Sequence, residues 1–474
     1  MSFWFSEIMV QGVVLKEVED GSRKVIVDVN PATGETIAEV PVTSFDEIEA
    51  LLAEAKAAQR EWARTPLRQR VDALKAAVKT LGPQSGELCA LMRREMGKLE
   101  AECKEEVDGV VDKDDYLELI YEANQDVQYT PKAKVVREAH GVVGISAPWN
   151  FPMDEILLLA LPALAAGNAA LVKPSEVAPL CGKAVVDALA ASLPVKNVIC
   201  LVQGDGAVGS FLFDRCDMLA LTGSSATGSK VMQTASGNLK PLVLECGGKD
   251  PMVVLKDCPD LGKAAHDAVE YSVMNCGQVC CAVERVYAPK SLLSDFEAKV
   301  LEAAKTKVDV APLVSQAQRD VVADHVQKAI DAGATALLGG PADFAELKTQ
   351  TPPGSSYYPL TVLSNVPHDA NRDETFGPVV AITPYDDDSE DDAAVVALAN
   401  DTVYGLSACV YGEPDHAAAV AASIRAGQVG VNTWPLADAP PQCPWVGHKM
   451  SGHGYHSGPD GWRQFSVPKS IISA

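Results

Sequence analysis

Apolar residues near the start of the chain recur at the spacing of a helix. Between residues 44 and 80 they return every three or four positions, and glutamate and lysine fill the positions between them. The residues that carry this pattern are Phe45, Ile48, Leu51, Leu52 and Ala55. We expect helical structure over 44–80 and a second long, acid-rich helical region over 85–125. Before them, the sequence NPATG at 30–34 predicts a turn between two short strands.

The rest of the chain alternates between short apolar runs and helical stretches, several of them rich in alanine. The first five strand-like runs are 141–146, 169–172, 198–202, 218–221 and 241–244. Five more follow at 251–255, 285–288, 335–338, 379–383 and 408–411. Such alternation is typical of βαβ units on a parallel sheet. It predicts an α/β fold with two sheet layers, the second from about residue 250 to residue 432.

The composition fits a large globular protein. A chain of 474 residues is longer than a single hydrophobic core usually supports, so two or three domains are expected. The 64 acidic residues outnumber the 40 basic ones, and the net charge of −24 opposes binding to nucleic acid or to anionic membranes. The longest apolar run, 156–172, contains Pro162, Gly167 and Asn168, which favours a buried helix and strand over a membrane span. The first 20 residues lack the basic segment and cleavage site of a secretory signal, so we expect a cytoplasmic protein.

Twelve cysteines are scattered along the chain without a C-x-x-C pair. That distribution favours free thiols in a reducing compartment over a disulfide framework or a zinc module, and we expect no metal. One of these cysteines, Cys280, lies in the sequence GQVCCA at 277–282, between a helical stretch and a strand-like run. A partly exposed thiol at such a junction can act as a nucleophile, and a small core residue is the alternative interpretation.

Two further segments have the residue types of a nucleotide site. The sequence GSSATG at 223–228 follows a strand-like run and precedes a helix, where backbone N–H groups can bind a phosphate. The sequence KPSE at 173–176 follows another strand-like run; its acid can hold ribose hydroxyls, and its lysine can reach sugar or phosphate. Each segment alone has a simpler interpretation, a β-turn for the first and an exposed, ion-paired turn for the second.

These segments occur, with several others, in the order found in the aldehyde dehydrogenase superfamily, and the chain resembles that family nearly from end to end. The matching segments are VNPATGETIAEV (29–40), PWNFP (148–152), LAAGNA (164–169), KPSE (173–176), GSSATG (223–228), LECGGK (244–249), GQVCCA (277–282), ETFGP (374–378), NDTVYGL (400–406) and KMSGHG (449–454). There are three departures from the family pattern. The segment 444–449 reads PWVGHK, 455–457 lacks the common arginine–glutamate pair, and 305–312 is shortened. Because of these three departures, the sequence does not identify the subfamily.

The resemblance implies catalytic roles for three residues. Cys280 would attack the aldehyde carbon to form a thiohemiacetal, and loss of hydride to NAD(P) would leave a thioester. Asn150, together with the backbone N–H of Cys280, would form the oxyanion hole. Glu245 would activate the water that hydrolyses the thioester to a carboxylic acid.

The same resemblance implies a cofactor site. Lys173 and Glu176 would hold the adenine ribose, and Glu374 and Phe376 would position the nicotinamide half. The other residues expected at this site are Ser146, Trp149, Gly204, Gly209, Gly223 and Ser224. Because a carboxylate repels a 2′-phosphate, Glu176 favours NAD, although Lys173 leaves NADP use open.

A tunnel for a small-molecule aldehyde is implied as well. Its expected lining residues are Phe151, Glu155, Leu158, Val279, Cys281, Trp434 and Trp445. A second acid, Asp438, is expected near the channel, and no arginine stands among these positions. A carboxylate substrate normally pairs with an arginine, so we expect a neutral or cationic aldehyde. The alternative is that Glu155 and Asp438 lie on the surface or in ion pairs.

Three other functions fit parts of the sequence. A CoA-acylating aldehyde dehydrogenase would transfer the acyl group to CoA, but such enzymes commonly lack the glutamate that Glu245 supplies. A catalytically silent structural or binding member of the fold is disfavoured by the intact residues Cys280, Glu245 and Asn150. A cysteine hydrolase would need a histidine base, and His266 and His325 lie in helical stretches without a sign of that role.

The family fold implies three parts. A Rossmann-type dinucleotide-binding domain would comprise 1–125 and 139–246, and an α/β catalytic domain would comprise 247–445. A small oligomerisation β-ribbon of 126–138 and 446–474 would bridge subunits. Because its edge strands would otherwise stay unpaired, a homodimer or homotetramer is expected.

Overall fold

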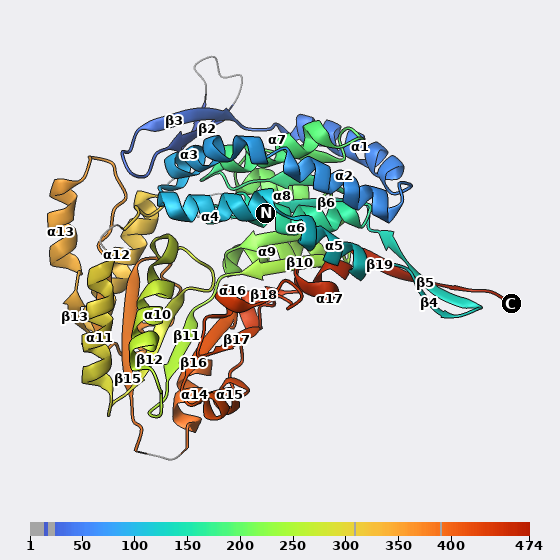
Figure 1. The fold of residues 1–474 in the computed structure, drawn as a ribbon. Coiled ribbons are helices and arrows are strands. Elements are labelled where there is room, and N and C mark those ends of the chain that lie inside the picture. The colour runs from blue at the N-terminus through green and yellow to red at the C-terminus, as the bar shows by residue number, and fades with distance from the viewer. Residues whose placement is uncertain (1–13, 18–23, 308–309, 389–390) are drawn as a thin grey trace.

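The computed structural model describes residues 14–17, 24–307, 310–388 and 391–474. Two large β-sheets with helices packed against them form its two layers, as Figure 1 shows. The first sheet has six strands in the order β18-β10-β9-β6-β7-β8. Their bounds are β6 Val142–Ser146, β7 Ala169–Lys173, β8 Ile199–Leu201, β9 Met218–Gly223, β10 Leu242–Cys246 and β18 Gly452–His453. Neighbouring strands are parallel, except that β18 is antiparallel to β10.

The connections between these strands place them on the two sides of β6. The connecting helices are α6 Asp154–Ala165, α7 Pro179–Ser192, α8 Gly206–Phe213 and α9 Ser225–Ser236. From β6 the chain passes through α6 and α7 to β7 and β8 on one side, and it then returns through α8 to β9 and β10 on the other side. The strand order therefore reverses between β6 and β9, which is the arrangement of a doubly wound dinucleotide-binding fold. The predicted strands of this region are confirmed, as is the buried helix followed by a strand.

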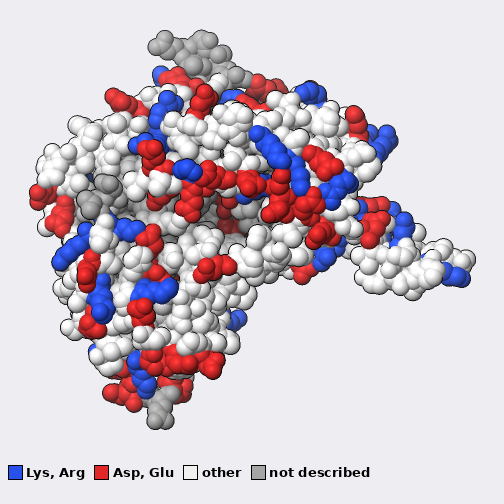
Figure 2. All heavy atoms as spheres, viewed as in Figure 1, with Lys and Arg blue, Asp and Glu red and all other residues white. Residues whose placement is uncertain are grey.

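Five helices from the first quarter of the chain cover this layer (Figure 1). They are α1 Phe45–Trp62, α2 Leu67–Lys79, α3 Ser85–Met96, α4 Glu100–Val111 and α5 Asp114–Ala123. The region expected to be helical over 44–80 is two helices, because Pro66 interrupts it. The region expected over 85–125 is three helices, and the first of them ends at Gly97, which has a φ of 72°. On the face shown in Figure 2, acidic side chains gather over α4 and α5 among fewer basic ones.

The second sheet has seven strands in the order β13-β14-β15-β12-β11-β16-β17. Their bounds are β11 Asp250–Val254, β12 Val283–Pro289, β13 Thr335–Leu338, β14 Thr361–Ser364, β15 Val379–Tyr385, β16 Ser407–Tyr411 and β17 Gln428–Val431. The helices and 3₁₀ turns of this part are α10 Leu261–Val273, η2 Met274–Gly277, α11 Leu293–Thr306, α12 Gln316–Asp331, α13 Pro341–Gln350, η3 His368–Ala370, α14 Ala393–Asn400, α15 Pro414–Ala421, α16 Pro435–Asp438 and η4 Lys449–Ser451. The five strands predicted here are confirmed, and the structure adds β14 and β17, which were not predicted.

Two small sheets complete the fold. The first comprises β1 Val14–Glu17, β2 Lys24–Val29 and β3 Thr36–Pro41, and the predicted turn at 30–34 joins its last two strands. The second comprises β4 Val127–Thr130, β5 Ala133–Ala139 and β19 Ser466–Ile472, and Figure 1 shows it projecting from the body with the C-terminus at its tip. Between β18 and β19, α17 Gly458–Arg463 packs against α5. A short turn, η1 Gly82–Gln84, precedes α3.

No helix within the described ranges is both long enough and apolar enough to cross a membrane. The segment on which the expectation of a missing secretory signal rests lies largely outside the described residues, since the structure describes only 14–17 of the first 23. The same holds for part of the shortened segment at 305–312, because residues 308–309 are not described. The division of the chain into three domains stays a prediction.

Candidate active site

The loop that carries Cys280 begins with an unusual backbone. After α10, the last three residues of η2 have φ angles of 50°, 58° and 73°, all in the left-handed region. The last of them is Gly277. A β-carbon on Gly277 would lie 2.1 Å from the carbonyl oxygen of Gly377, so a larger residue does not fit there. This turn redirects the chain before β12 and leaves Cys280 half-buried.

The fold brings the carboxyl group of Glu245, on β10, to the thiol of Cys280. Burial and then the charge of Glu155 raise the pKa of Glu245 well above its usual value, and the Trp445 indole and the Cys280 thiol partly offset this rise. A hydrogen bond with Cys281 and burial raise the pKa of the Cys280 thiol well above its usual range, and the Glu245 carboxylate adds to the shift. Cys280 is therefore a protonated thiol at neutral pH, and a base must take its proton before it can react.

Glu245 is nearly enclosed, with 3% of its surface exposed. The indole Nε1 of Trp445 donates to its Oε1 at 3.4 Å, while Oε2 is buried without a hydrogen-bond partner. On the neighbouring strand, Thr222 stands in register with Glu245, and its hydroxyl is also buried without a partner. A buried polar atom without a protein partner is a position where water or a reacting group usually binds.

Asn150 contacts the same loop from the segment that precedes α6. Its Nδ2 donates to the carbonyl oxygen of Gln278 at 3.1 Å, and Asn275 Nδ2 donates to the carbonyl oxygen of Asn150 at 3.1 Å. The side chain of Gln278 in turn accepts from the N–H of Val314 at 2.8 Å. These bonds fix the Asn150 amide beside the cysteine loop. An amide nitrogen carries two hydrogens, and the bond to Gln278 uses one of them.

Several expected cofactor residues lie where the strand order reverses. Ser146 ends β6, Lys173 ends β7 and Gly223 ends β9, so all three are at the carboxyl edge of the first sheet. Ligands of doubly wound folds bind in the crevice at this edge. Ser224 caps α9 by accepting from the N–H of Thr227 at 3.2 Å. The first N–H groups of a helix have no partner within the helix, so the start of α9 suits a pyrophosphate.

Lys173 is held in place by several oxygens. Its Nζ donates to Glu176 Oε2 at 3.0 Å and to the carbonyl oxygens of Gly204 at 2.9 Å and Pro174 at 3.1 Å. A β-carbon on Gly209 would lie 3.3 Å from the lysine Cε, so the glycine lets α8 pack against the lysine stem. Lys173 is buried, whereas 22% of the Glu176 side chain is exposed. The pair therefore presents its carboxylate to the crevice.

A buried ion pair that the sequence analysis missed holds the loop of Glu374 and Phe376. Lys249 Nζ and Glu284 Oε2 lie 2.7 Å apart, with 1% and 6% of their side chains exposed. The Glu284 carboxylate accepts the N–H groups of Thr375 at 2.7 Å and Phe376 at 2.8 Å. Since a carboxylate with two backbone donors and a lysine is fully satisfied, this pair fixes the loop conformation. Lys249 belongs to the LECGGK segment, but nothing in the sequence pairs it with Glu284.

Glu374 itself faces the glycines that follow β10. Its Oε1 accepts the N–H of Gly248 at 3.1 Å, and burial raises its pKa to about 8. A β-carbon on Gly247 would lie 2.1 Å from the Glu374 carboxylate, so a glycine is needed there. Phe376, with a φ of 54°, packs edge to face on Trp149 with 5.4 Å between ring centroids.

Most of the expected tunnel residues share one hydrophobic core. Val279, Cys281 and Trp434 are buried members of that core, and Phe151, Trp445 and Cys280 pack against it. Trp434 Nε1 donates to the carbonyl oxygen of Cys281 at 2.9 Å, which ties the tryptophan to the cysteine loop. Glu155 and Leu158, on the first turns of α6, are half-buried. The aromatic and aliphatic surface beside Cys280 suits an apolar substrate body.

Two charged side chains near these positions differ in exposure and in pairing. Asp438 is exposed at the end of α16, where it accepts from the Thr433 hydroxyl, so the alternative of a surface acid holds for this residue. Lys98 lies 4.0 Å from the ring centroid of Phe151, but its Nζ is paired with Glu106 at 2.6 Å and is almost fully buried. The charge of Lys98 is therefore already compensated by Glu106.

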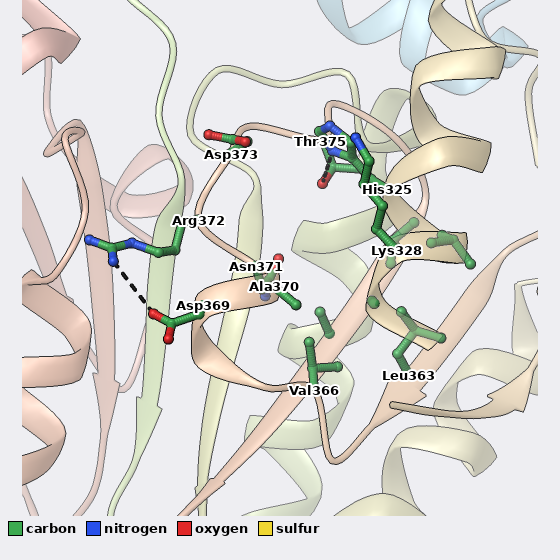
Figure 3. Close-up of a pocket in the computed structure, with 14 residues that line it drawn as sticks. His325, Lys328, Leu363, Val366, Asp369, Ala370, Asn371, Arg372, Asp373 and Thr375 are labelled. Carbon is green, nitrogen blue, oxygen red and sulfur yellow. Dashed lines mark hydrogen bonds and ion pairs between the residues drawn. The ribbon is translucent and has the colours of Figure 1, made fainter. Parts of the chain in front are cut away.

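A cavity of about 70 Å³ is lined in part by Asp373 and Thr375, the neighbours of Glu374 in sequence. Figure 3 shows His325, Lys328, Arg372 and Thr375 around it, with His325 Nδ1 3.2 Å from the Thr375 hydroxyl. Cys280, Glu245 and Asn150 are not part of its lining, so this cavity is separate from the candidate active site. Within the described ranges, no group of three or more His, Cys, Asp or Glu residues is arranged to hold a metal ion.

Comparison with known proteins gives one consistent family. Residues 18–471 match the model of the Aldehyde dehydrogenase family. A relative from Mycobacterium tuberculosis (strain ATCC 25618 / H37Rv), named putative succinate-semialdehyde dehydrogenase (NADP(+)) 2, is 34% identical over 93% of this chain and 87% of its own. The protein of the same name from Mycobacterium ulcerans is 32% identical over 99% of this chain and 92% of its own.

Solved structures share the fold over nearly the whole chain. An aldehyde dehydrogenase of Mycobacterium tuberculosis, solved in complex with NAD+, is 30% identical with a TM-score of 0.84, and the match covers 94% of each chain. A mutant of aldehyde dehydrogenase C from Pseudomonas syringae, solved with NAD+ and octanal, is 29% identical with a TM-score of 0.86, covering 94% of this chain and 93% of its own.

Proposed function

Because the chain belongs to the aldehyde dehydrogenase family and is an NAD(P)-dependent oxidoreductase acting on aldehydes, we propose that Cys280 is its nucleophile and Glu245 its base. One observation supports this proposal: Glu245 is a buried carboxyl with one oxygen free of hydrogen bonds, and its charge raises the pKa of the Cys280 thiol. A thiol whose pKa is raised needs such a base, and a buried carboxyl whose pKa is also raised is a strong enough base to serve it.

The first half of the reaction forms a bond to sulfur. Glu245 takes the proton of the Cys280 thiol, and the thiolate adds to the aldehyde carbon to give a thiohemiacetal. The negative charge that develops on the aldehyde oxygen is stabilised by the second N–H of the Asn150 amide and by the backbone N–H of Cys280. NAD(P)+ supplies the hydride acceptor, and the cysteine is left as a thioester.

The second half of the reaction releases the acid. Glu245 takes a proton from a water molecule, and the resulting hydroxide adds to the thioester carbon. The carbon–sulfur bond then breaks, which frees the carboxylic acid and returns Cys280 as a thiolate. Glu245 Oε2, which is buried without a partner, is the oxygen available to this water.

The cofactor residues fit a dinucleotide in the crevice of the first sheet. The start of α9, with Gly223 and Ser224, would hold the pyrophosphate, and Lys173 and Glu176 would hold the adenine ribose. Glu374 and Phe376, fixed by the buried Lys249–Glu284 pair, would position the nicotinamide half. Gly204, Gly209, Ser146 and Trp149 would complete the lining. The Glu176 carboxylate favours NAD over NADP, because it would repel a 2′-phosphate.

The substrate is proposed to be a neutral or cationic aldehyde. The positions beside Cys280 combine an apolar surface with the carboxyls of Glu155 and Glu245, and the lysine that touches Phe151 is paired with Glu106. A succinic semialdehyde is the second candidate, because the curated relatives carry that substrate in their names. Its carboxylate would need a cation that these tunnel positions do not offer.

A substrate panel separates these candidates. The specificity constants of octanal, betaine aldehyde and succinic semialdehyde should be compared with NAD+ and then with NADP+. We expect the neutral or cationic aldehyde and NAD+ to give the highest values. A highest value for succinic semialdehyde would establish the second candidate instead. Dependence of acyl release on added CoA would indicate an acylating enzyme, and no NADH with any aldehyde would indicate a silent member of the fold.

We further propose that the chain forms a homodimer or homotetramer through the projecting sheet β4-β5-β19. Its exposed apolar side chains include Tyr129 at 71% and Ile472 at 78%. Strand edges with exposed apolar residues are unfavourable on a monomer and pair readily with a second copy. This sheet is the core of the proposed oligomerisation ribbon, 126–138 and 446–474, beside the cofactor domain, 1–125 and 139–246, and the catalytic domain, 247–445. Light scattering on the intact chain tests the assembly.

A further inference from the structure

The mechanism leaves a proton on Glu245 in each half of the reaction, and that proton must reach solvent. Glu245 is 3% exposed. The hydrogen bond to its Oε1 comes from the indole of Trp445, and an indole N–H donates but cannot accept a proton. The other oxygen, Oε2, has no hydrogen-bond partner. A path for the proton therefore has to begin at Oε2.

Buried polar atoms without partners lie on one side of Glu245. They are Glu245 Oε2, the hydroxyl of Thr222 and Oε2 of Glu155. Thr222 stands in register with Glu245 on the adjacent strand, and its hydroxyl lowers the pKa of the Glu155 carboxyl. The charge of Glu155 is also felt at both Glu245 and Cys280. Polar atoms of this kind, close together in a protein interior, are bridged by ordered water.

The row of acids continues from Glu155 to solvent. The next residue, Asp154, has 29% of its side chain exposed, and its carboxylate is paired with Lys113 Nζ at 2.6 Å. The groups that act on the Glu155 carboxyl come from four elements: Asp154 beside it on α6, Glu106 on α4, Lys113 at the start of α5 and Thr222 on β9. Glu155, whose charge acts on the buried base Glu245, is therefore next in sequence to an acid whose side chain is partly exposed.

We propose that Glu155 is a proton-relay residue, which takes the proton of Glu245 through water near Thr222 and passes it to solvent at Asp154. The inference rests on the proposed roles of Cys280 and Glu245. In each transfer one O–H bond forms on Glu155 as another breaks, and the Glu245 carboxylate is restored for the next step. No oxidant or further reactant is needed, because only protons move.

The electrostatics of Glu155 suit this role. Burial and the neighbouring charge of Asp154 raise its pKa to about 8. A carboxyl with such a pKa exchanges its proton readily near neutral pH, whereas a carboxyl with the ordinary pKa would release a proton and rarely accept one.

The test measures hydrolysis of the acyl-enzyme in Glu155→Gln, which keeps the size of the side chain and removes its acid–base function. Intact-protein mass spectrometry after rapid mixing with aldehyde and NAD+ gives the acylated fraction. We expect NADH to form at the wild-type rate in the first turnover, followed by acyl-enzyme that decays about 10- to 100-fold more slowly. Glu155→Asp should recover part of the rate. The acidic limb of the pH profile for hydrolysis should move to lower pH, because Glu245 loses a like charge.

Asp438→Asn is the matched control, since Asp438 is an exposed acid outside the row, and it should hydrolyse the acyl-enzyme normally. Wild-type decay with an unmoved pH limb in Glu155→Gln would overturn the proposal. Equal slowing in Glu155→Gln and Glu155→Asp with an unmoved pH limb would overturn it too, because a structural role would then suffice. If Glu155→Gln does not fold, the same measurement is made on Thr222→Val. Acyl-enzyme that decays at the wild-type rate in Thr222→Val would refute the relay. A wild-type enzyme that never forms an acyl adduct would refute the proposed function instead.

Discussion

The indole N–H of Trp445 donates to the buried carboxyl of Glu245 at 3.4 Å, so one side chain of the tunnel is bonded to the proposed base. This bond favours the charged form of Glu245 and partly offsets burial and the charge of Glu155, which raise its pKa. We therefore expect the tryptophan to serve two purposes: it would contribute apolar surface for the substrate, and its N–H would orient the proposed base.

Trp445→Phe should leave less of Glu245 ionised at neutral pH while keeping an aromatic side chain at this position of the proposed tunnel. Loss of the N–H removes a bond that lowers the pKa of Glu245, so the acidic limb of the kcat profile should move to higher pH. A long hydrogen bond contributes about 0.5–1.5 kcal/mol, which predicts roughly a 2- to 10-fold lower kcat at neutral pH. Steady-state kinetics over pH 5–9 test this prediction, and an unchanged profile would show that the indole does not act on Glu245.

Glu284→Gln should loosen the loop that carries Glu374 and Phe376. The substitution leaves Lys249 buried without its counter-charge, which costs about 3–5 kcal/mol of folding stability. We also expect the KM for NAD+ to rise more than the KM for the aldehyde. Asp108→Asn is a suitable control, because it breaks an exposed ion pair with Lys104, and exposed pairs contribute little to stability. Denaturant unfolding and cofactor titration measure both effects; equal stability losses in the two variants would contradict the account.

Asp28→Asn should stabilise the protein at neutral and alkaline pH. Burial raises the pKa of Asp28 from its ordinary 3.8 to about 6, and both carboxylate oxygens lack hydrogen-bond partners. A raised carboxyl pKa means that the folded state holds the proton longer than the unfolded state, so stability falls as pH rises from about 4 through 6. The variant should therefore gain roughly 1–3 kcal/mol above pH 6 and nothing below pH 4. Thermal melts at pH 4, 6 and 8 test the sign; a gain that is largest at pH 4 would contradict it.

The sequence predicted those parts of the fold that repeat a pattern. The strands at 141–146 and 218–221 were recognisable because each is a short apolar run followed by a helix, and ten such runs became strands. Breaks in the long helical regions were less visible, since single residues decide two of them, Pro66 and Gly97, and the third, at 112–113, has neither a proline nor a glycine. β17, with the sequence QVGV, was not predicted because its alternation is short and includes a glycine.

The candidate site was predictable where the family resemblance supplied a position, as for Cys280 and Glu245. Contacts between distant charged residues were not predictable, because no periodicity relates Lys249 to Glu284. The same limit applies to Glu155. The sequence predicted an acid beside a proposed tunnel, but no pattern in it relates Glu155 on α6 to Thr222 on β9 or to Glu245 on β10, whose charges and hydroxyl act on one another in the fold.

The proposed mechanism requires that the sulfur of Cys280 forms the bond to the substrate, and the neighbouring Cys281 offers a matched control. NADH formation should be measured by absorbance for the wild type, Cys280→Ala and Cys281→Ala, after NAD+ binding has shown that each variant is folded. The account predicts that Cys280→Ala loses activity by more than about 1,000-fold while Cys281→Ala keeps most of it. NADH formation at the wild-type rate in Cys280→Ala would contradict the account.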